Sequence, residues 1–250
     1  MKKLYIVGLG PGNQSDITSR ALDAISKSDV VAGYKTYIDL ISSLLDGKTV
    51  ISSGMMTEIE RCKKALESAA SGRTTSLVCS GDSGVFALAS PVLELSPSFA
   101  DVEIEIVPGI TAAISSSAIL GSPLAHDFAV ISLSDALTPR AVILQRLLLC
   151  ARAGLCIALY NPMSKNRPDA LKNAVSALLT ELSEDTVCAY ARNVGREGEE
   201  WRICTLLALE EMELDMFCTV FIGNKSTKIV ETKNRKYIVT PRGYEKKYEL

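Results

Sequence analysis

Short turns, most of them rich in glycine, follow apolar runs at several points of this 250-residue chain. They lie at residues 8–12 (Gly-Leu-Gly-Pro-Gly), 80–84 (Ser-Gly-Asp-Ser-Gly), 108–112 (Pro-Gly-Ile-Thr-Ala) and 161–162 (Asn-Pro). Glycine lets the main chain approach a ligand closely, and main-chain N–H groups then act as donors. In open α/β sheets, ligands bind beyond the carboxyl ends of the strands. These turns therefore predict a small-molecule site built mostly from main chain.

The first turn differs from a dinucleotide-binding fingerprint. The third glycine of that pattern falls at Asn13, and Pro11 lacks the N–H that a phosphate cradle uses. The second expected strand ends at residues 32–34 without an acid for a ribose hydroxyl. A dinucleotide-binding oxidoreductase is therefore the disfavoured alternative from another functional class.

Two acidic positions and one histidine stand out. Asp82 follows a strand-like run and either contacts a ligand or backbone amide or caps the next helix, and the sequence leaves both open. His126, the sole histidine, precedes Asp127. It is a candidate general base or a donor to an acidic substrate, although a lone histidine is more often a structural hydrogen-bonding group.

Cations follow two strand-like runs, at residues 161–167 and 192–196. If these loops share a cleft, their cations could bind carboxylates, whereas each loop alone is typical of solvated charge. The turn at residues 241–244 leaves the same two interpretations.

The hydrophobic pattern predicts alternating strands and helices in the first half and hence an α/β fold with parallel strands. Strands are expected at residues 4–7, 30–32, 77–80 and 102–107, the last at a sheet edge, and helices from residues 15–25, 58–70 and 111–120. The Gly-Ser-Pro break at 121–123 predicts domains 1–121 and 122–250. The second half is expected to be mixed, with strands at 128–133, 155–160, 187–191, 216–222 and 237–240 and helices at 139–149 and 170–182.

Composition argues against several classes of partner, although a local basic patch stays open. Lys and Arg number 27 against 29 Asp and Glu, which does not indicate a nucleic-acid-binding surface. No apolar run approaches the roughly 18 residues of a membrane span. The seven cysteines are odd in number and lack C-x-x-C spacing, so we expect buried thiols in a reducing cytoplasm and no metal site.

Together these segments resemble the tetrapyrrole methylase family, the class III S-adenosylmethionine-dependent methyltransferases. The resemblance covers essentially the whole chain. It departs at Phe86, Ala87 and Arg140, where a tyrosine, a glycine and a tryptophan are expected. The matching segments are residues 7–12, 54–61, 80–85, 107–113, 120–128, 131–135, 160–162 with Ser164 and Arg167, 223–224 and 240–244.

The resemblance implies two α/β domains with mainly parallel and mixed sheets, an active site in the cleft between them, and a homodimer. It also implies S-adenosylmethionine bound by main chain. The cofactor contacts that it implies are Pro11, Gly81, Asp82, Val85, Thr111, Ala112, Asn161 and Val194.

The resemblance further implies methyl transfer to carbon 17 of a precorrin-3B or cobalt-factor III macrocycle, with ring contraction, in cobalamin biosynthesis. Contraction moves protons on the substrate, and His126 and Asp127 are the candidates for that step. The substrate's carboxylates would bind cations, for which the candidates are Lys165, Arg167, Arg192 and Arg242. A sister methylase acting at another carbon, a diphthamide methyltransferase and a non-catalytic paralogue remain alternatives.

Overall fold

The computed structural model describes residues 2–244 and 247. The chain divides into two compact units, Met1–Ala112 and Ala113–Leu250. The sequence places the division nine residues later, at 121/122. The helix at 112–120 accounts for the difference, because Ala113 and Leu120 pack in a cluster with Ala158, Ala189 and Phe221 of the second unit.

The first unit contains a parallel sheet with strand order β3-β2-β4-β1-β5. Its strands are β1 (Lys3–Gly8), β2 (Val30–Tyr34), β3 (Thr49–Ser53), β4 (Thr75–Cys79) and β5 (Glu103–Val107). Its helices are α1 (Ser19–Ser26), α2 (Lys35–Leu40), α3 (Glu58–Ala70) and α4 (Ala89–Leu95), with 3-10 turns at Gln14–Asp16, Ser42–Leu44 and Ser96–Phe99. The parallel α/β arrangement predicted for the first half is confirmed.

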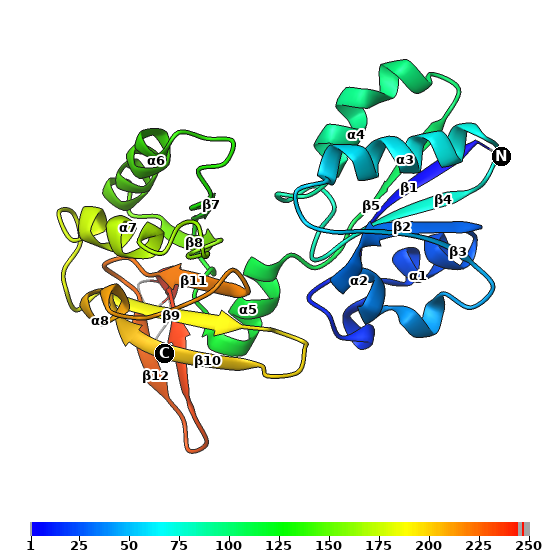
Figure 1. The fold of residues 1–250 in the computed structure, drawn as a ribbon. Coiled ribbons are helices and arrows are strands. Elements are labelled where there is room, and N and C mark those ends of the chain that lie inside the picture. Colours follow the sequence, from blue (N-terminus) through cyan, green and yellow to red (C-terminus); the bar gives the residue numbers. More distant parts are fainter. Residues whose placement is uncertain (1, 245–246, 248–250) are drawn as a thin grey trace. The chain divides into compact units, whose positions relative to one another are not determined.

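Successive side chains at residues 4–7 of β1 are apolar and point to opposite faces of the sheet, which explains why helices cover both faces. Leu4 and Ile6 pack with α3 and α4, whereas Tyr5 and Val7 pack with α1 and α2. Figure 1 shows these two pairs of helices on opposite sides of the strands. The predicted edge position of β5 is also confirmed.

The second unit contains a mixed sheet with strand order β10-β9-β11-β8-β7. Only β7 and β8 pair in parallel among these neighbours, and the other ladders are antiparallel in the described residues. Its strands are β7 (Phe128–Ser132), β8 (Cys156–Tyr160), β9 (Val187–Arg192), β10 (Glu200–Thr205) and β11 (Cys218–Ile222). The mixed sheet predicted for the second half is thus confirmed.

Helices and a small sheet complete this unit. Helices α6 (Arg140–Arg152), α7 (Ala170–Leu178) and α8 (Leu206–Glu210) pack on one face of the mixed sheet, and α5 (Ala112–Leu120) packs on the other. The small sheet joins β12 (Lys228–Glu231), β13 (Lys236–Val239) and β6 (Gly121–Ser122). Arg235 ties it to α5, because its guanidinium donates to the Ile119 carbonyl and stacks on Trp201 and Tyr237.

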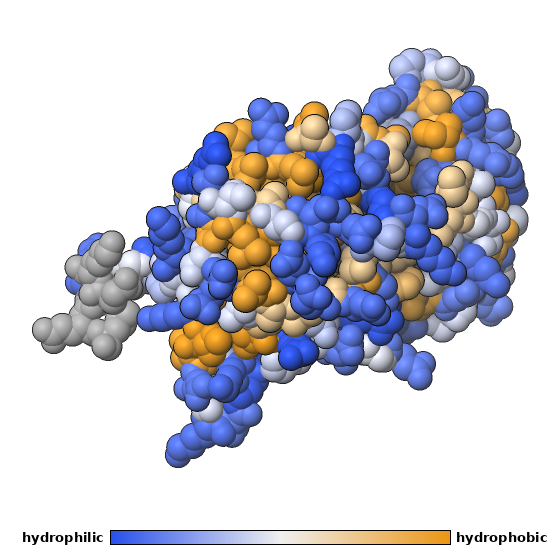
Figure 2. All heavy atoms as spheres, turned by 60° about the vertical axis from the view of Figure 1, so that its left-hand side comes forward, coloured by the Kyte–Doolittle hydropathy of each residue, from blue (hydrophilic) through white to orange (hydrophobic). Residues whose placement is uncertain are grey.

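The surface carries scattered apolar side chains. On the face drawn in Figure 2, hydrophobic residues form separate patches among hydrophilic ones. Among the described residues, no helix is long and apolar enough to cross a membrane.

Candidate functional site

The turns after β1 and β4 are joined by main-chain hydrogen bonds. Gly10 N–H donates to the Gly81 carbonyl at 3.0 Å, and Gly81 N–H donates to the Gly10 carbonyl at 2.7 Å. Leu9 N–H also donates to the Cys79 carbonyl at 2.9 Å. The two glycine-rich segments, 71 residues apart in sequence, therefore form one rigid edge at the carboxyl ends of neighbouring strands.

The turn after β5 lies against the other two, and glycine is required for this approach. A Cβ on Gly109 would stand 2.2 Å from the Gly81 oxygen, and one on Gly8 would stand 2.6 Å from Gly109 N. Gly10 and Gly81 also have positive φ angles of 75° and 66°, which side chains disfavour. The structure therefore brings the three turns of the first unit together.

Asp82 fixes this arrangement with both carboxylate oxygens. Oδ1 accepts the Gly84 N–H at 2.8 Å, and Oδ2 accepts the Gly109 N–H at 3.0 Å. The next residue, Ser83, is fully buried and donates to the Val107 carbonyl at 3.0 Å. Of the contacts that the sequence left open, those with backbone amides are observed, and through them Asp82 positions the turns after β4 and β5.

The other first-unit cofactor candidates lie on the same three turns. Pro11 is buried, whereas Val85, Thr111 and Ala112 are half-buried. Thr111 precedes α5, whose first residues are small, so few side-chain atoms cover the main chain there. This edge suits a ligand that is recognised by main-chain groups.

Two strained residues near this edge were not identified as functional by sequence reasoning. Met56 and Phe86 have φ angles of 62° and 52°, in the region that bulky residues rarely adopt. Both are exposed and follow β3 and β4 respectively. Such strain is concentrated at functional sites, and no residue pattern reveals it without the backbone.

In the second unit, the carboxyl ends of β7, β8 and β9 share one edge of the sheet. Asn161 follows β8 with a φ of 53°, and its Nδ2 donates to Ser132 Oγ at the end of β7 at 3.0 Å. Asn193 follows β9 with a φ of 50°, and Val194 comes next, half-buried. Asn161 and Val194 therefore lie on the same sheet edge.

His126 and Asp127 lie at the opposite end of β7. The main-chain carbonyl of Asp127 accepts the Cys156 N–H at 3.3 Å, beside the first residues of β7 and β8. A five-residue strand separates this end from Ser132 by about 16 Å. The structure therefore does not bring this pair to the edge that carries Asn161.

The local contacts of His126 are made with Asp127 alone in the described interactions. Its Nδ1 accepts the Asp127 N–H at 2.7 Å and lies 3.4 Å from Asp127 Oδ2. The imidazole is 48% exposed, so its loss removes little packing.

The candidate substrate-binding cations differ in whether a neighbouring acid offsets their positive charge. Arg192 is paired with Asp215 at 2.8 Å, and Arg167 lies 3.7 Å from Asp135 and donates to the Leu133 carbonyl. Lys165 and Arg242 are exposed.

The Arg192–Asp215 pair is maintained by several hydrogen bonds. Partial burial alone raises the pKa of Asp215, but hydrogen bonds from Arg192 and the Phe217 N–H outweigh it and lower that pKa. Asp215 therefore stays ionised near neutral pH and offsets the charge of Arg192.

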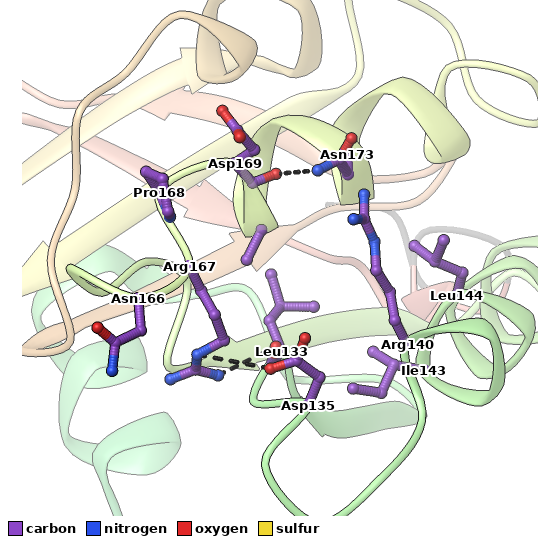
Figure 3. Close-up of a pocket in the computed structure, with 11 residues that line it drawn as sticks. Leu133, Asp135, Arg140, Ile143, Leu144, Asn166, Arg167, Pro168, Asp169 and Asn173 are labelled. Carbon is purple, nitrogen blue, oxygen red and sulfur yellow. Dashed lines mark hydrogen bonds and ion pairs between the residues drawn. The ribbon is translucent and has the colours of Figure 1, made fainter.

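A pocket of about 180 Å³ lies beside Arg167 (Figure 3). The loops after β7 and β8 and the first turns of α6 and α7 line it, with Leu133, Asp135, Arg140, Ile143, Arg167 and Asn173 among its residues. In the part of the chain that the structure describes, no cluster of three His, Cys, Asp or Glu side chains could hold a metal ion.

The family model for tetrapyrrole (corrin/porphyrin) methylases matches residues 3–210, and the chain belongs to this family. It is 40% identical over 242 residues to a probable cobalt-factor III C(17)-methyltransferase of Salmonella typhimurium, covering 96% of this chain and 99% of that one. It is 38% identical to a precorrin-3B C(17)-methyltransferase of a Sinorhizobium species, covering 96% of each.

Solved structures agree with this family. The crystal structure of the methyltransferase CobJ superposes with a TM-score of 0.88 at 34% identity, covering 95% of this chain and 99% of CobJ. A uroporphyrin-III C-methyltransferase of Thermus thermophilus, crystallised with S-adenosylhomocysteine, has the same fold at 21% identity. Its TM-score is 0.70, over 88% of this chain and 92% of that one.

Proposed function

We propose that this chain transfers a methyl group from S-adenosylmethionine to carbon 17 of cobalt-factor III or precorrin-3B, with ring contraction, in cobalamin biosynthesis. The observation that carries the proposal is the 40% identity to a probable cobalt-factor III C(17)-methyltransferase over nearly the full length of both chains. The same similarity supports a cytoplasmic enzyme that acts on a tetrapyrrole.

The first-unit turns fit S-adenosylmethionine because they combine left-handed glycines with small side chains at the start of α5. When bound, this cofactor supplies an electrophilic methyl group on a sulfonium sulfur. The residues proposed to hold it are Pro11, Gly81, Asp82, Val85, Thr111, Ala112, Asn161 and Val194. Asp82 also fixes two of the turns. Because the methyl group is already activated, the protein's main task is to hold the reacting atoms in line.

Calorimetry tests the cofactor. S-adenosylhomocysteine is expected to bind and NAD is not. Ala112→Leu is expected to lower the affinity for S-adenosylhomocysteine by a factor of about ten or more, or roughly 1.4 kcal/mol, because the larger side chain would occupy space beside the turn. Ala118→Leu is the control, since Ala118 is exposed on the same helix. Tight NAD binding without S-adenosylhomocysteine binding would contradict the proposal.

Product analysis tests the reaction. The protein is incubated with labelled S-adenosylmethionine and either cobalt-factor III or precorrin-3B, and the product is identified by mass and NMR. Label at carbon 17 of a contracted ring is expected. Label at another carbon would identify a sister methylase.

We also propose roles for the remaining candidates. His126 and Asp127 would handle proton movement during ring contraction, and Lys165, Arg167, Arg192 and Arg242 would pair with substrate carboxylates. The chemistry of these side chains supports the roles, since His126 and Asp127 lie at the other end of β7 from Asn161. Arg167 and Arg192 would bind substrate while they keep their acidic partners Asp135 and Asp215. A homodimer is proposed on the family resemblance, so sedimentation equilibrium should give twice the chain mass of 26.9 kDa.

A further inference from the structure

The pocket between α6 and α7 lies beyond the carboxyl ends of β7 and β8, the position where α/β sheets bind ligands. Its volume of about 180 Å³ is below the range of about 300 Å³ and above that holds drug-sized ligands. It therefore has room for a short chemical group and not for a whole macrocycle.

Arg140, an exposed side chain, has no hydrogen-bond or ion-pair partner among the residues that the structure describes, whereas Arg167 is paired with Asp135. Figure 3 shows Arg140 extending from α6 toward Asn173 of α7. The other acid of the pocket, Asp169, points its carboxylate away from Leu133 and Ile143 (Figure 3). Of the two charges of the pocket that have no ion pair, Asp169 is thus turned away, and Arg140 is the one with which an anion in the pocket would pair.

Two helices also begin at this pocket without side-chain caps. Neither Pro139 before α6 nor Asp169 before α7 makes a capping hydrogen bond with its side chain. Ala170 N–H donates to the Arg167 carbonyl, but the Asp169 side chain does not accept from the following N–H groups of α7 as an N-cap aspartate usually does. The peptide dipoles of both helices add to the attraction for an anion.

The pocket wall is apolar on one side. Leu133, Ile143 and Leu144 line it together with Arg140. An alkyl carboxylate matches this combination, because its methylene groups contact the wall while its charge pairs with the guanidinium.

We propose that this pocket binds one acid side chain of the tetrapyrrole substrate, with Arg140 as its cationic partner. The inference rests on the proposed function, and it adds a binding residue at one of the positions where this chain departs from its family resemblance. Arg140 is then a substrate-binding residue and takes no part in methyl transfer.

The test compares Arg140→Gln with Arg146→Gln, a control that removes one exposed cation from the same helix outside the pocket. Affinities for cobalt-factor III and S-adenosylhomocysteine are measured by fluorescence quenching and calorimetry. Arg140→Gln is expected to lower the affinity for cobalt-factor III about tenfold, or roughly 1.4 kcal/mol, and to leave the affinity for S-adenosylhomocysteine unchanged. Arg140→Lys should recover part of the loss, and Arg146→Gln should match the wild type.

The outcomes separate this inference from the proposed function. Equal cobalt-factor III affinity in the wild type and Arg140→Gln overturns the inference alone. A parallel loss of S-adenosylhomocysteine affinity also overturns it, since the pocket would then serve the cofactor. A wild-type protein that binds S-adenosylhomocysteine but neither tetrapyrrole would defeat the proposed function and this inference with it.

Discussion

At the scale of single residues, Asp82 acts through the main chain that it holds. Its two oxygens accept N–H groups from Gly84 and Gly109, which belong to different turns. A carboxylate has two oxygens and can accept a hydrogen bond from each of these N–H groups. An asparagine would place its NH₂ group, which is a donor, against one of them, and that hydrogen bond would be lost. The acid is therefore required for the geometry of the site even if no ligand atom touches it.

Asp82→Asn is expected to lower the free energy of unfolding by about 2 kcal/mol, the range for hydrogen bonds to a charged group. It should also lower the affinity for S-adenosylhomocysteine, because the turn after β5 loses the hydrogen bond from Gly109 N–H to Asp82. Urea denaturation and calorimetry on one preparation measure both effects. Asp101→Asn is the matched control, since Asp101 is 83% exposed and pairs with Lys2 on the surface. Unchanged stability and affinity in Asp82→Asn would remove this positioning role.

His126→Ala is expected to preserve the fold, because the imidazole is half exposed and its described contacts are with its neighbour Asp127. The melting temperature should change little, and the affinity for S-adenosylhomocysteine should stay the same. If His126 moves a proton, turnover falls by roughly 10²-fold or more. Single-turnover kinetics with the same sample measure it. A stable and fully active variant would assign the proton transfer to another group.

At the scale of elements, the three glycine-rich turns act as one unit. Gly109→Ala would place its Cβ 2.2 Å from the Gly81 oxygen, and the nearest atoms are all backbone, so no side chain can move aside. We expect a large loss of stability, visible as a fall of several degrees in the melting temperature, and loss of S-adenosylhomocysteine binding.

Gly54→Ala is the control for this substitution, since its added Cβ meets nothing within 4 Å. It should melt within about one degree of the wild type. A Gly109→Ala variant with wild-type melting and affinity would show that the turns after β1, β4 and β5 are not interlocked in solution.

The elements that could be predicted from sequence are those with a buried, periodic face. Residues 58–70 form α3 as predicted, because Cys62, Ala65, Leu66 and Ala69 recur on one buried side. The strands that were missed, β3, β6, β10 and β12, lie at sheet edges and have no buried residue, so they lack a strong apolar pattern.

The same limit applies to the candidate site. Glycine spacing predicted the turns of the first unit, since the requirement for glycine is local. The sequence places His126 just before the strand predicted at 128–133, but which strand lies beside it, and hence which side chains share its edge of the sheet, depends on strand pairing. That pairing, like the partners of Asp82, is set by tertiary structure and leaves no mark in the neighbouring residues.

At the scale of the whole molecule, the cysteines are distributed through the cores of both units and none forms a disulfide. Burial raises the pKa of the Cys62 and Cys204 thiols to about 11 and that of Cys79 and Cys218 to about 12. Since the thiolate is the reactive form, a thiol of pKa 11 is about one-thousandth ionised at pH 8. Methyl transfer and ring contraction are therefore expected to proceed without a cysteine nucleophile.

Thiol titration checks this expectation. At pH 8, the native protein should react slowly with 5,5′-dithiobis(2-nitrobenzoate), whereas all seven thiols should react at once in guanidinium. Cys150, half-buried on α6, is expected to react first, and burial still raises its pKa. Cys150→Ser should remove this first phase and leave methyl transfer unchanged. A native thiol that reacts as fast as free cysteine would reveal a lowered pKa and return cysteine chemistry to the mechanism.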